Sequence, residues 1–174
     1  MYHFTYVLSE KDYWELNKFH LLYSKSGKRS INLMRLTVPM ILLAFILLSD
    51  VWEVEFNTIL LEIIIFTIGS IVWLFAAKPV VLFRAKRHIA TMKKDGKLPF
   101  EKNVSLQFDE DFVIGTTERG ESKIRYTAIE KTCVGSDAIY IYTNAVQAHI
   151  IPLYVFESQE QISGFLAFIK NKAG

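Results

Sequence analysis

The chain has little of what catalytic and metal sites are built from. Its 174 residues include a single cysteine, Cys133, and four histidines that are scattered along the sequence. One cysteine excludes an intrachain disulfide, and no cluster of ligands or of nucleophile and base has the spacing of a known site. Glycine-rich phosphate loops and internal repeats are absent as well. We therefore expect no catalytic residue, no metal site and no cofactor, and a protein that is not an enzyme.

Cys133 and His149 are the one pair that could imitate a thiol and its base. Both lie within predicted strands without an accompanying turn signal, and a cysteine of this kind is more often a small packed residue. Basic residues do not alternate with the aromatic ones, so nucleic acid is not an expected partner.

Long apolar runs are what the sequence has in abundance. Residues 33–52 and 56–77 are apolar around the full circumference of a helix, and only the acidic connector Glu53-Val54-Glu55 separates them. At a rise of about 1.5 Å per residue they span roughly 30 and 33 Å, which matches a bilayer's hydrocarbon thickness. We expect a transmembrane helical hairpin over residues 33–83, with Trp52 at the outer interface. The alternative, a buried hairpin in a soluble protein, lacks enough other chain to cover it.

Charges beside the runs predict the topology. Basic residues flank the hairpin on both sides, whereas the connector has none. Because Lys and Arg stay on the cytoplasmic side, we expect a multi-pass protein of the cell membrane with both termini in the cytoplasm. Residues 84–102 form a basic juxtamembrane segment in which Gly96 and Pro99 end a helix. Its cations either set topology alone or also contact anionic lipid head groups; these candidate lipid contacts are Arg84, Lys86, Arg87, Lys93 and Lys94.

Glu62 is the candidate functional residue inside the membrane. A carboxylate there costs about 2.5 to 3.5 kcal/mol on insertion scales. It either reaches the outer interface, or Ser49 or Thr58 across the hairpin neck, or contributes to a polar ring in an oligomeric pore. Gly69 and Ser70 would allow the helices of such an oligomer to approach closely.

The rest of the chain predicts one soluble module. In residues 1–32 a strand over Tyr2 to Leu8 precedes an amphipathic helix with Ser9 as its N-cap, and the strand must pair with strands beyond residue 100. Residues 103–174 alternate as about six short strands, followed by a helix with a Ser158–Gln161 capping box. We expect an α+β domain, a small antiparallel β barrel or sandwich of pleckstrin-homology-like character that the C-terminal helix closes and the N-terminal strand joins.

Several segments carry a family resemblance: residues 4–13, 126–131 and 138–142, then Ile150-Ile151-Pro152 and Phe156. In these the chain resembles the YcxB-like family, bacterial proteins with two transmembrane helices and a C-terminal domain of pleckstrin-homology-like character. The resemblance implies a bacterial membrane protein and no particular biochemical activity. Leu153 stands where the family tends to place a basic residue.

The function we expect is that of a non-enzymatic membrane protein that presents a cytoplasmic binding or scaffold domain to a protein partner. An exposed sheet edge or a groove beside a helix would receive the partner. The alternative is a subunit of an oligomeric channel or a transporter accessory, with Glu62 as its intramembrane polar residue. The lipid bilayer and either an unidentified protein or further copies of the chain are the expected partners.

Overall fold

The computed structural model describes residues 2–49, 56–94, 101–145 and 147–173. Two compact units make up the chain. Residues 1–19 and 92–174 form the first, which we call the sheet unit, and residues 20–91 form the second, the hairpin unit. The acidic connector, Trp52, Gly96 and Pro99 lie outside the described residues.

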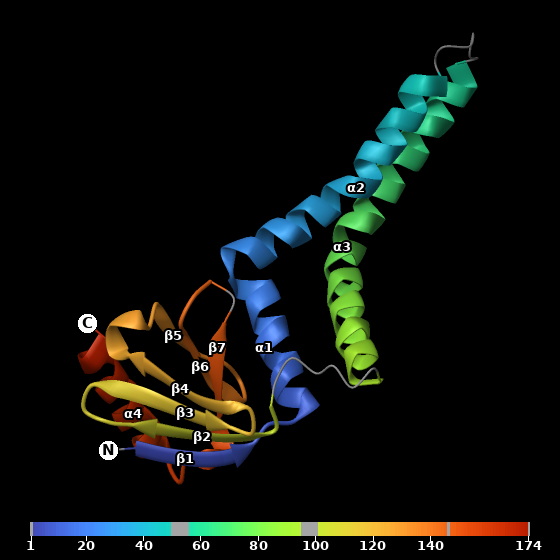
Figure 1. Ribbon diagram of the computed structural model, residues 1–174. Coiled ribbons are helices and arrows are strands. Elements are labelled where there is room, and N and C mark those ends of the chain that lie inside the picture. The colour runs from blue at the N-terminus through green and yellow to red at the C-terminus, as the bar shows by residue number, and fades with distance from the viewer. Residues whose placement is uncertain (1, 50–55, 95–100, 146, 174) are drawn as a thin grey trace. The chain divides into compact units, whose positions relative to one another are not determined.

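The sheet unit contains two antiparallel sheets (Figure 1). The first has the strand order β1-β2-β3-β4 and the second β5-β6-β7. The strands are β1 (Tyr2–Val7), β2 (Asn103–Phe108), β3 (Phe112–Thr117), β4 (Gly120–Arg125), β5 (Lys131–Val134), β6 (Ala138–Tyr142) and β7 (Ala148–Pro152). The helical elements are α1 (Glu10–Tyr23), the 3-10 turns η1 (Tyr126–Ala128) and η2 (Leu153–Val155), and α4 (Gln159–Ala173).

Strand β1 is hydrogen-bonded to β2, although the whole hairpin unit separates them in sequence. The register runs from Tyr2 opposite Phe108 to Val7 opposite Asn103, and the Leu8 N–H donates to the Lys102 carbonyl at 2.7 Å. A single strand has no stability of its own in water. The prediction that the N-terminal strand joins the strands beyond residue 100 is therefore confirmed by this ladder.

The core of the sheet unit lies between the two sheets and α4. Phe165 on α4 is fully buried, and its ring lies 4.9 Å from that of Phe108 and 5.3 Å from that of Phe4. On the other side of the second sheet, the ring of Phe19 from α1 lies 5.0 Å from that of Tyr140. All five residues of β6, the central strand of the second sheet, are buried and belong to this core.

The expected barrel does not close. Among the described residues, no ladder joins β4 to β5 or β1 to β7, so the sheets remain two. One corner is bridged by a side chain, since the Tyr6 hydroxyl donates to the Ile150 carbonyl of β7 at 2.5 Å. The sandwich alternative of the prediction describes this arrangement better than the barrel does.

The predicted Ser9 N-cap and the predicted Ser158–Gln161 capping box are both present. The Ser9 N–H donates to the Asp12 carboxylate at 2.8 Å, and the Asp12 N–H donates to Ser9 Oγ at 3.3 Å. At α4, the Gln161 N–H donates to Ser158 Oγ at 3.2 Å, while the Gln161 side chain accepts from the Glu157 N–H at 2.7 Å. These caps satisfy amide donors that a helix N-terminus would otherwise leave unpaired.

The hairpin unit consists of two long helices, α2 (Lys25–Ser49) and α3 (Phe56–Lys94). Each is long and apolar enough to cross a membrane. Within the protein, only 6% of the most apolar 18-residue stretch of α2 is buried, and 0% of that of α3. Contacts between the described parts of the two helices include a hydrogen bond from Trp73 Nε1 to the Met34 carbonyl at 2.8 Å. Glycine at position 69 permits a close approach, since a Cβ there would lie 3.1 Å from Leu42 Cδ1.

The helices extend beyond the predicted spans. Helix α2 begins at Lys25, eight residues before the predicted start at Leu33, because the Ser24 hydroxyl caps the Gly27 N–H at 2.9 Å. Helix α3 continues past residue 77 through Pro79 to Lys94 and bends along its length (Figure 1). Proline lacks the N–H that an interior turn needs, and bends of this kind are common where it occurs.

Candidate functional site

The described part of the sheet unit includes three hollows of a size relevant to binding. The hairpin pocket, of about 450 Å³, lies at the β2–β3 turn. The His149 pocket, of about 270 Å³, lies between β2, β7 and α1. The β5–α4 groove, of about 310 Å³, lies between the edge strand of the second sheet and the last helix. These volumes are at or near the lower end of those that hold small ligands or peptide side chains.

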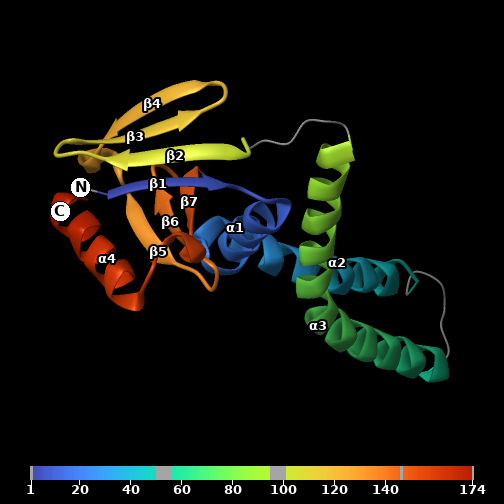
Figure 2. The same ribbon diagram turned by 90° about the horizontal axis from the view of Figure 1, so that it is seen from below.

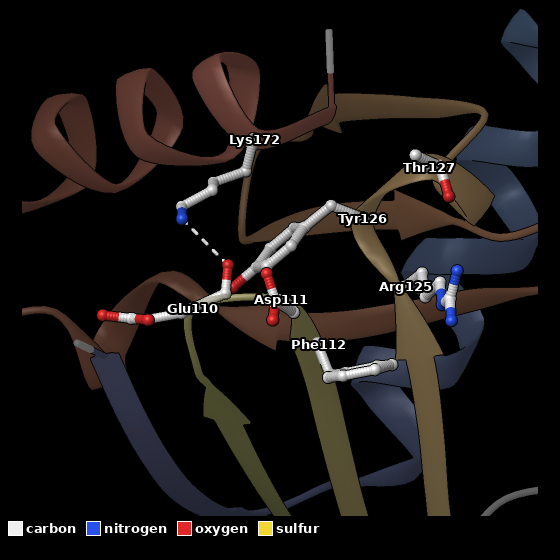
Figure 3. A pocket seen from close by; sticks show the side chains of 7 residues that line it. All are labelled: Glu110, Asp111, Phe112, Arg125, Tyr126, Thr127 and Lys172. Carbon is white, nitrogen blue, oxygen red and sulfur yellow. Dashed lines mark hydrogen bonds between the residues drawn. The ribbon is translucent and has the colours of Figure 1, made fainter.

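The hairpin pocket is a structural junction (Figure 3). The Lys172 ammonium at the end of α4 donates to the Glu110 carbonyl at 2.8 Å, and the Tyr126 hydroxyl donates to the Asp109 carbonyl at 2.8 Å. Burial raises the pKa of Tyr126 to about 12, so this donor stays protonated. The charges of the lining cancel, since the acidic Glu110 and Asp111 are balanced by the basic Arg125 and Lys172. The pocket therefore ties α4 to the β2–β3 turn and offers no net charge to a ligand.

The His149 pocket is largely apolar. Burial lowers the pKa of His149, which keeps its imidazole neutral at physiological pH. A Cβ at Gly115 would lie 3.0 Å from Ser122 Oγ and 3.3 Å from Leu106 Cδ2, so these two side chains favour glycine there, whereas His149 Cε1, at 3.6 Å, would be in ordinary contact.

Cys133 and His149 do not form a thiol and base pair. Cys133 lies opposite Tyr140 and His149 opposite Ile141, on strands that flank β6 from its two sides. Because neighbouring residues of a strand point to opposite faces, the two side chains also face away from each other.

The partly buried imidazole of His149 predicts a pH dependence of stability. His149 takes up a proton near pH 6.5 in the unfolded chain and only at lower pH when folded. The neutral ring's contribution to the free energy of unfolding is therefore complete above about pH 6.5 and is lost as the pH falls through the folded-state pKa. Stability is measured by pulse proteolysis in urea at about pH 7.5 and about pH 5.5. The natural protein should lose more stability at the lower pH than His149→Gln does. Equal losses would assign the pH dependence to other groups.

The β5–α4 groove is the hollow best suited to a partner. One wall is β5 with the residues that lead into it, and the other is a single face of α4; the lining is Ile129, Glu130, Lys131, Thr132, Leu166, Ile169, Lys170 and Ala173. The four α4 residues follow the spacing i, i+3, i+4, i+7, which places them on one side of a helix. Ile129 and Ile169 are buried and form the floor. Figure 2 shows α4 beside β5.

Sequence reasoning did not find this groove, because its walls come from segments more than thirty residues apart and neither has a binding motif. The available signal was in α4. The apolar residues Ile162, Phe165, Leu166 and Ile169 recur at helical spacing, yet Leu166 remains partly exposed while the other three are buried. An apolar face wider than the core requires is what marks the groove.

The predicted lipid contacts all lie on α3. Arg84, Lys86, Arg87, Lys93 and Lys94 are exposed. At about 100° per residue they occupy one half of the helix surface, and Ala85, Ile89 and Met92 lie on the other half. The Lys93 ammonium also forms an ion pair with the Glu10 carboxylate at 2.7 Å.

The predicted intramembrane residues lie within the helix pair. Glu62 is partly buried on α3, and Ser70 has a buried hydroxyl. Gly69 faces Leu42 of α2 in the same chain. The close approach that a small residue permits is therefore used inside the hairpin at this position.

Comparison with known proteins adds one match. A family model described as YcxB-like protein matches residues 108–169, from the end of β2 to the last turns of α4. Searches of curated proteins and of solved structures returned no match for this chain. The matched segment contains β5 and most of α4, and thus most of the groove. The resemblance to the YcxB-like family is thereby confirmed for residues 108–169.

Proposed function

We propose that the chain is a non-enzymatic integral membrane protein whose two apolar helices anchor a cytoplasmic, pleckstrin-homology-like binding domain. A four-stranded sheet, a three-stranded sheet and a closing C-terminal helix follow one another in the order typical of such domains. The hairpin unit is inserted between the first and second strands. In this proposal it occupies the place of a connecting loop.

The observation that carries the proposal is the β1–β2 ladder. Strands that are hydrogen-bonded to each other must lie in the same aqueous compartment, and here one precedes the apolar helices while the other follows them. The intervening chain must then cross the membrane an even number of times, which agrees with two spans. The basic residues on both flanks favour the cytoplasm as that compartment.

The second half of α3 supports attachment to the membrane surface. At about 1.5 Å per residue the 39 residues of the whole helix α3 extend roughly 58 Å, which is about twice the hydrocarbon thickness of a bilayer. The half beyond the bilayer carries Lys78 and the five predicted lipid contacts, all of them exposed. Near an anionic surface each contributes about 1 kcal/mol of attraction.

Binding accounts for the described polar groups better than catalysis does. The donors of the hairpin pocket bond to backbone carbonyls, and the imidazole of His149 is neutral among apolar neighbours. The open groove, which has both apolar and polar lining residues, remains as the surface for a partner.

The test is cysteine labelling in intact cells. In a Cys133→Ser background, single cysteines are introduced at Lys11, Glu157 and Glu53, and each is exposed to a membrane-impermeant maleimide before and after lysis. We expect Glu53→Cys to react in intact cells, and Lys11→Cys and Glu157→Cys to react only after lysis. Reaction of Lys11→Cys and Glu157→Cys from opposite faces would refute the proposal.

A further inference from the structure

Three of the four sheet edges are covered or charged. The Tyr154 hydroxyl donates to the Val7 carbonyl on the edge of β1 at 3.1 Å, and Tyr6 covers the edge of β7 in the same way. Strand β4 carries exposed charged side chains at Glu121, Lys123 and Arg125. Proteins protect sheet edges by these means against unwanted pairing. The remaining edge is β5, and it borders the groove.

The hydrogen-bond pattern identifies which backbone groups of β5 point outward. The Gly135 N–H donates to the Ala138 carbonyl at 2.8 Å, which fixes this pair as hydrogen-bonded. Hydrogen-bonded and non-hydrogen-bonded pairs alternate along an antiparallel ladder. Cys133 and Lys131 therefore bond to β6, whereas the N–H and C=O groups of Thr132 and Val134 point away from it.

The side chains beside this edge define what would fit. Leu166 and Ala173 offer an apolar surface above the buried Ile169, and the exposed Lys170 forms no ion pair among the described residues. The Lys131 ammonium lies 4.5 Å from the centre of the Tyr142 ring. The groove thus combines outward backbone groups, an apolar floor and one uncommitted cation.

We propose that the β5–α4 groove binds an extended segment of a partner protein as an added strand beside β5. The segment pairs with the outward groups of Thr132 and Val134, places an apolar side chain on Leu166 and Ile169, and directs a carboxylate to Lys170. Main-chain bonds supply affinity in this mode and alternate side chains supply specificity. The inference rests on the proposed binding function and names the partner's chemistry.

The test uses random peptides displayed on phage and selected on the full chain in lipid nanodiscs. We expect enriched peptides to share an apolar residue and an acidic residue. Thr132→Pro removes one outward N–H, at an edge position where proline is tolerated, and Thr132→Val retains it. Thr132→Pro should weaken peptide binding about tenfold or more, since each backbone hydrogen bond contributes about 1 kcal/mol and the ring obstructs pairing. Thr132→Val should bind like the natural protein.

A charge reversal tests the groove without altering the backbone. Lys170→Glu should weaken binding of the acidic peptides and improve binding of the same peptides with lysine in place of the acid. Lys102→Glu, at an exposed position outside the groove, is the matched control and should change neither. This pair remains informative if Thr132→Pro fails to fold, which cooperative urea unfolding would reveal.

The outcomes separate the inference from the function on which it rests. If the enriched peptides bind all four variants equally, the groove is not their binding site, and the proposed binding function is unaffected. Selection that enriches nothing would overturn both. Protection of the Thr132 and Val134 amides from hydrogen exchange without added peptide would show that a second copy or the chain itself occupies the edge, and would overturn the partner segment.

Discussion

Residues 101–174 alone are expected to remain unfolded in buffer, whereas the same residues joined to residues 1–19 are expected to fold without detergent. The reason is the position of β1. Phe4, Tyr6 and Leu8 are each at most 7% exposed, and burying three such side chains contributes about 5 to 9 kcal/mol. That is comparable with the whole stability of a domain of this size.

A chain suited to this measurement replaces residues 20–100 by a glycine-serine linker. Leu8 and Lys102 are hydrogen-bonded neighbours, so a linker from Phe19 must return along about 15 Å of α1. About 12 flexible residues span roughly 19 Å on average and suffice. Circular dichroism and urea unfolding should show a cooperative transition in the linked chain and none in residues 101–174 alone. Cooperative unfolding of the shorter chain would contradict the role of β1.

Phe165→Ala should be the most damaging single substitution in the sheet unit, with a loss of about 3 to 5 kcal/mol. The Phe165 ring is fully buried and lies within 5.5 Å of the rings of Tyr2, Phe4, Phe108 and Phe156. Its removal leaves a cavity where both sheets meet α4, and the rigid strands around it cannot collapse to fill the space.

Phe168→Ala is the matched control, because it removes the same side chain from the same helix at a partly buried position. Its ring contacts Tyr2 at 5.3 Å and Tyr126 at 5.9 Å. We expect a clearly smaller loss, measured as the shift of the urea midpoint in the linked chain. Similar losses for the two variants would show that α4 stabilises the unit by helix formation and not through the Phe165 contacts.

Much of the fold could be predicted because it rests on local patterns. Alternation at Tyr2 to Leu8 follows from the two-residue period of a strand, and the Ser9 and Ser158 boxes follow from the geometry of helix ends. The need of a lone strand for partners connected β1 with the later strands. The family resemblance pointed to the same module, and its match covers residues 108–169.

What could not be predicted depends on long-range packing. Whether the sheets close into a barrel depends on pairings between β4 and β5 and between β1 and β7, and single-strand patterns do not encode these. Helix α2 begins early because Ser24 caps it, a signal that the adjoining basic residues obscured. The groove is invisible in one dimension, since Thr132 and Lys170 become neighbours of the same hollow only after folding.

The wide separation of β1 from its partner also has a consequence for biosynthesis. Tyr2 lies opposite Phe108. A ribosome that adds about 5 to 20 residues per second therefore needs roughly 5 to 20 s between the synthesis of Tyr2 and that of Phe108. During that interval β1, with its aromatic side chains, has no partner strand. It must be protected from aggregation until β2 has been synthesised. The β1–β2 ladder can therefore form only after both apolar helices have been synthesised.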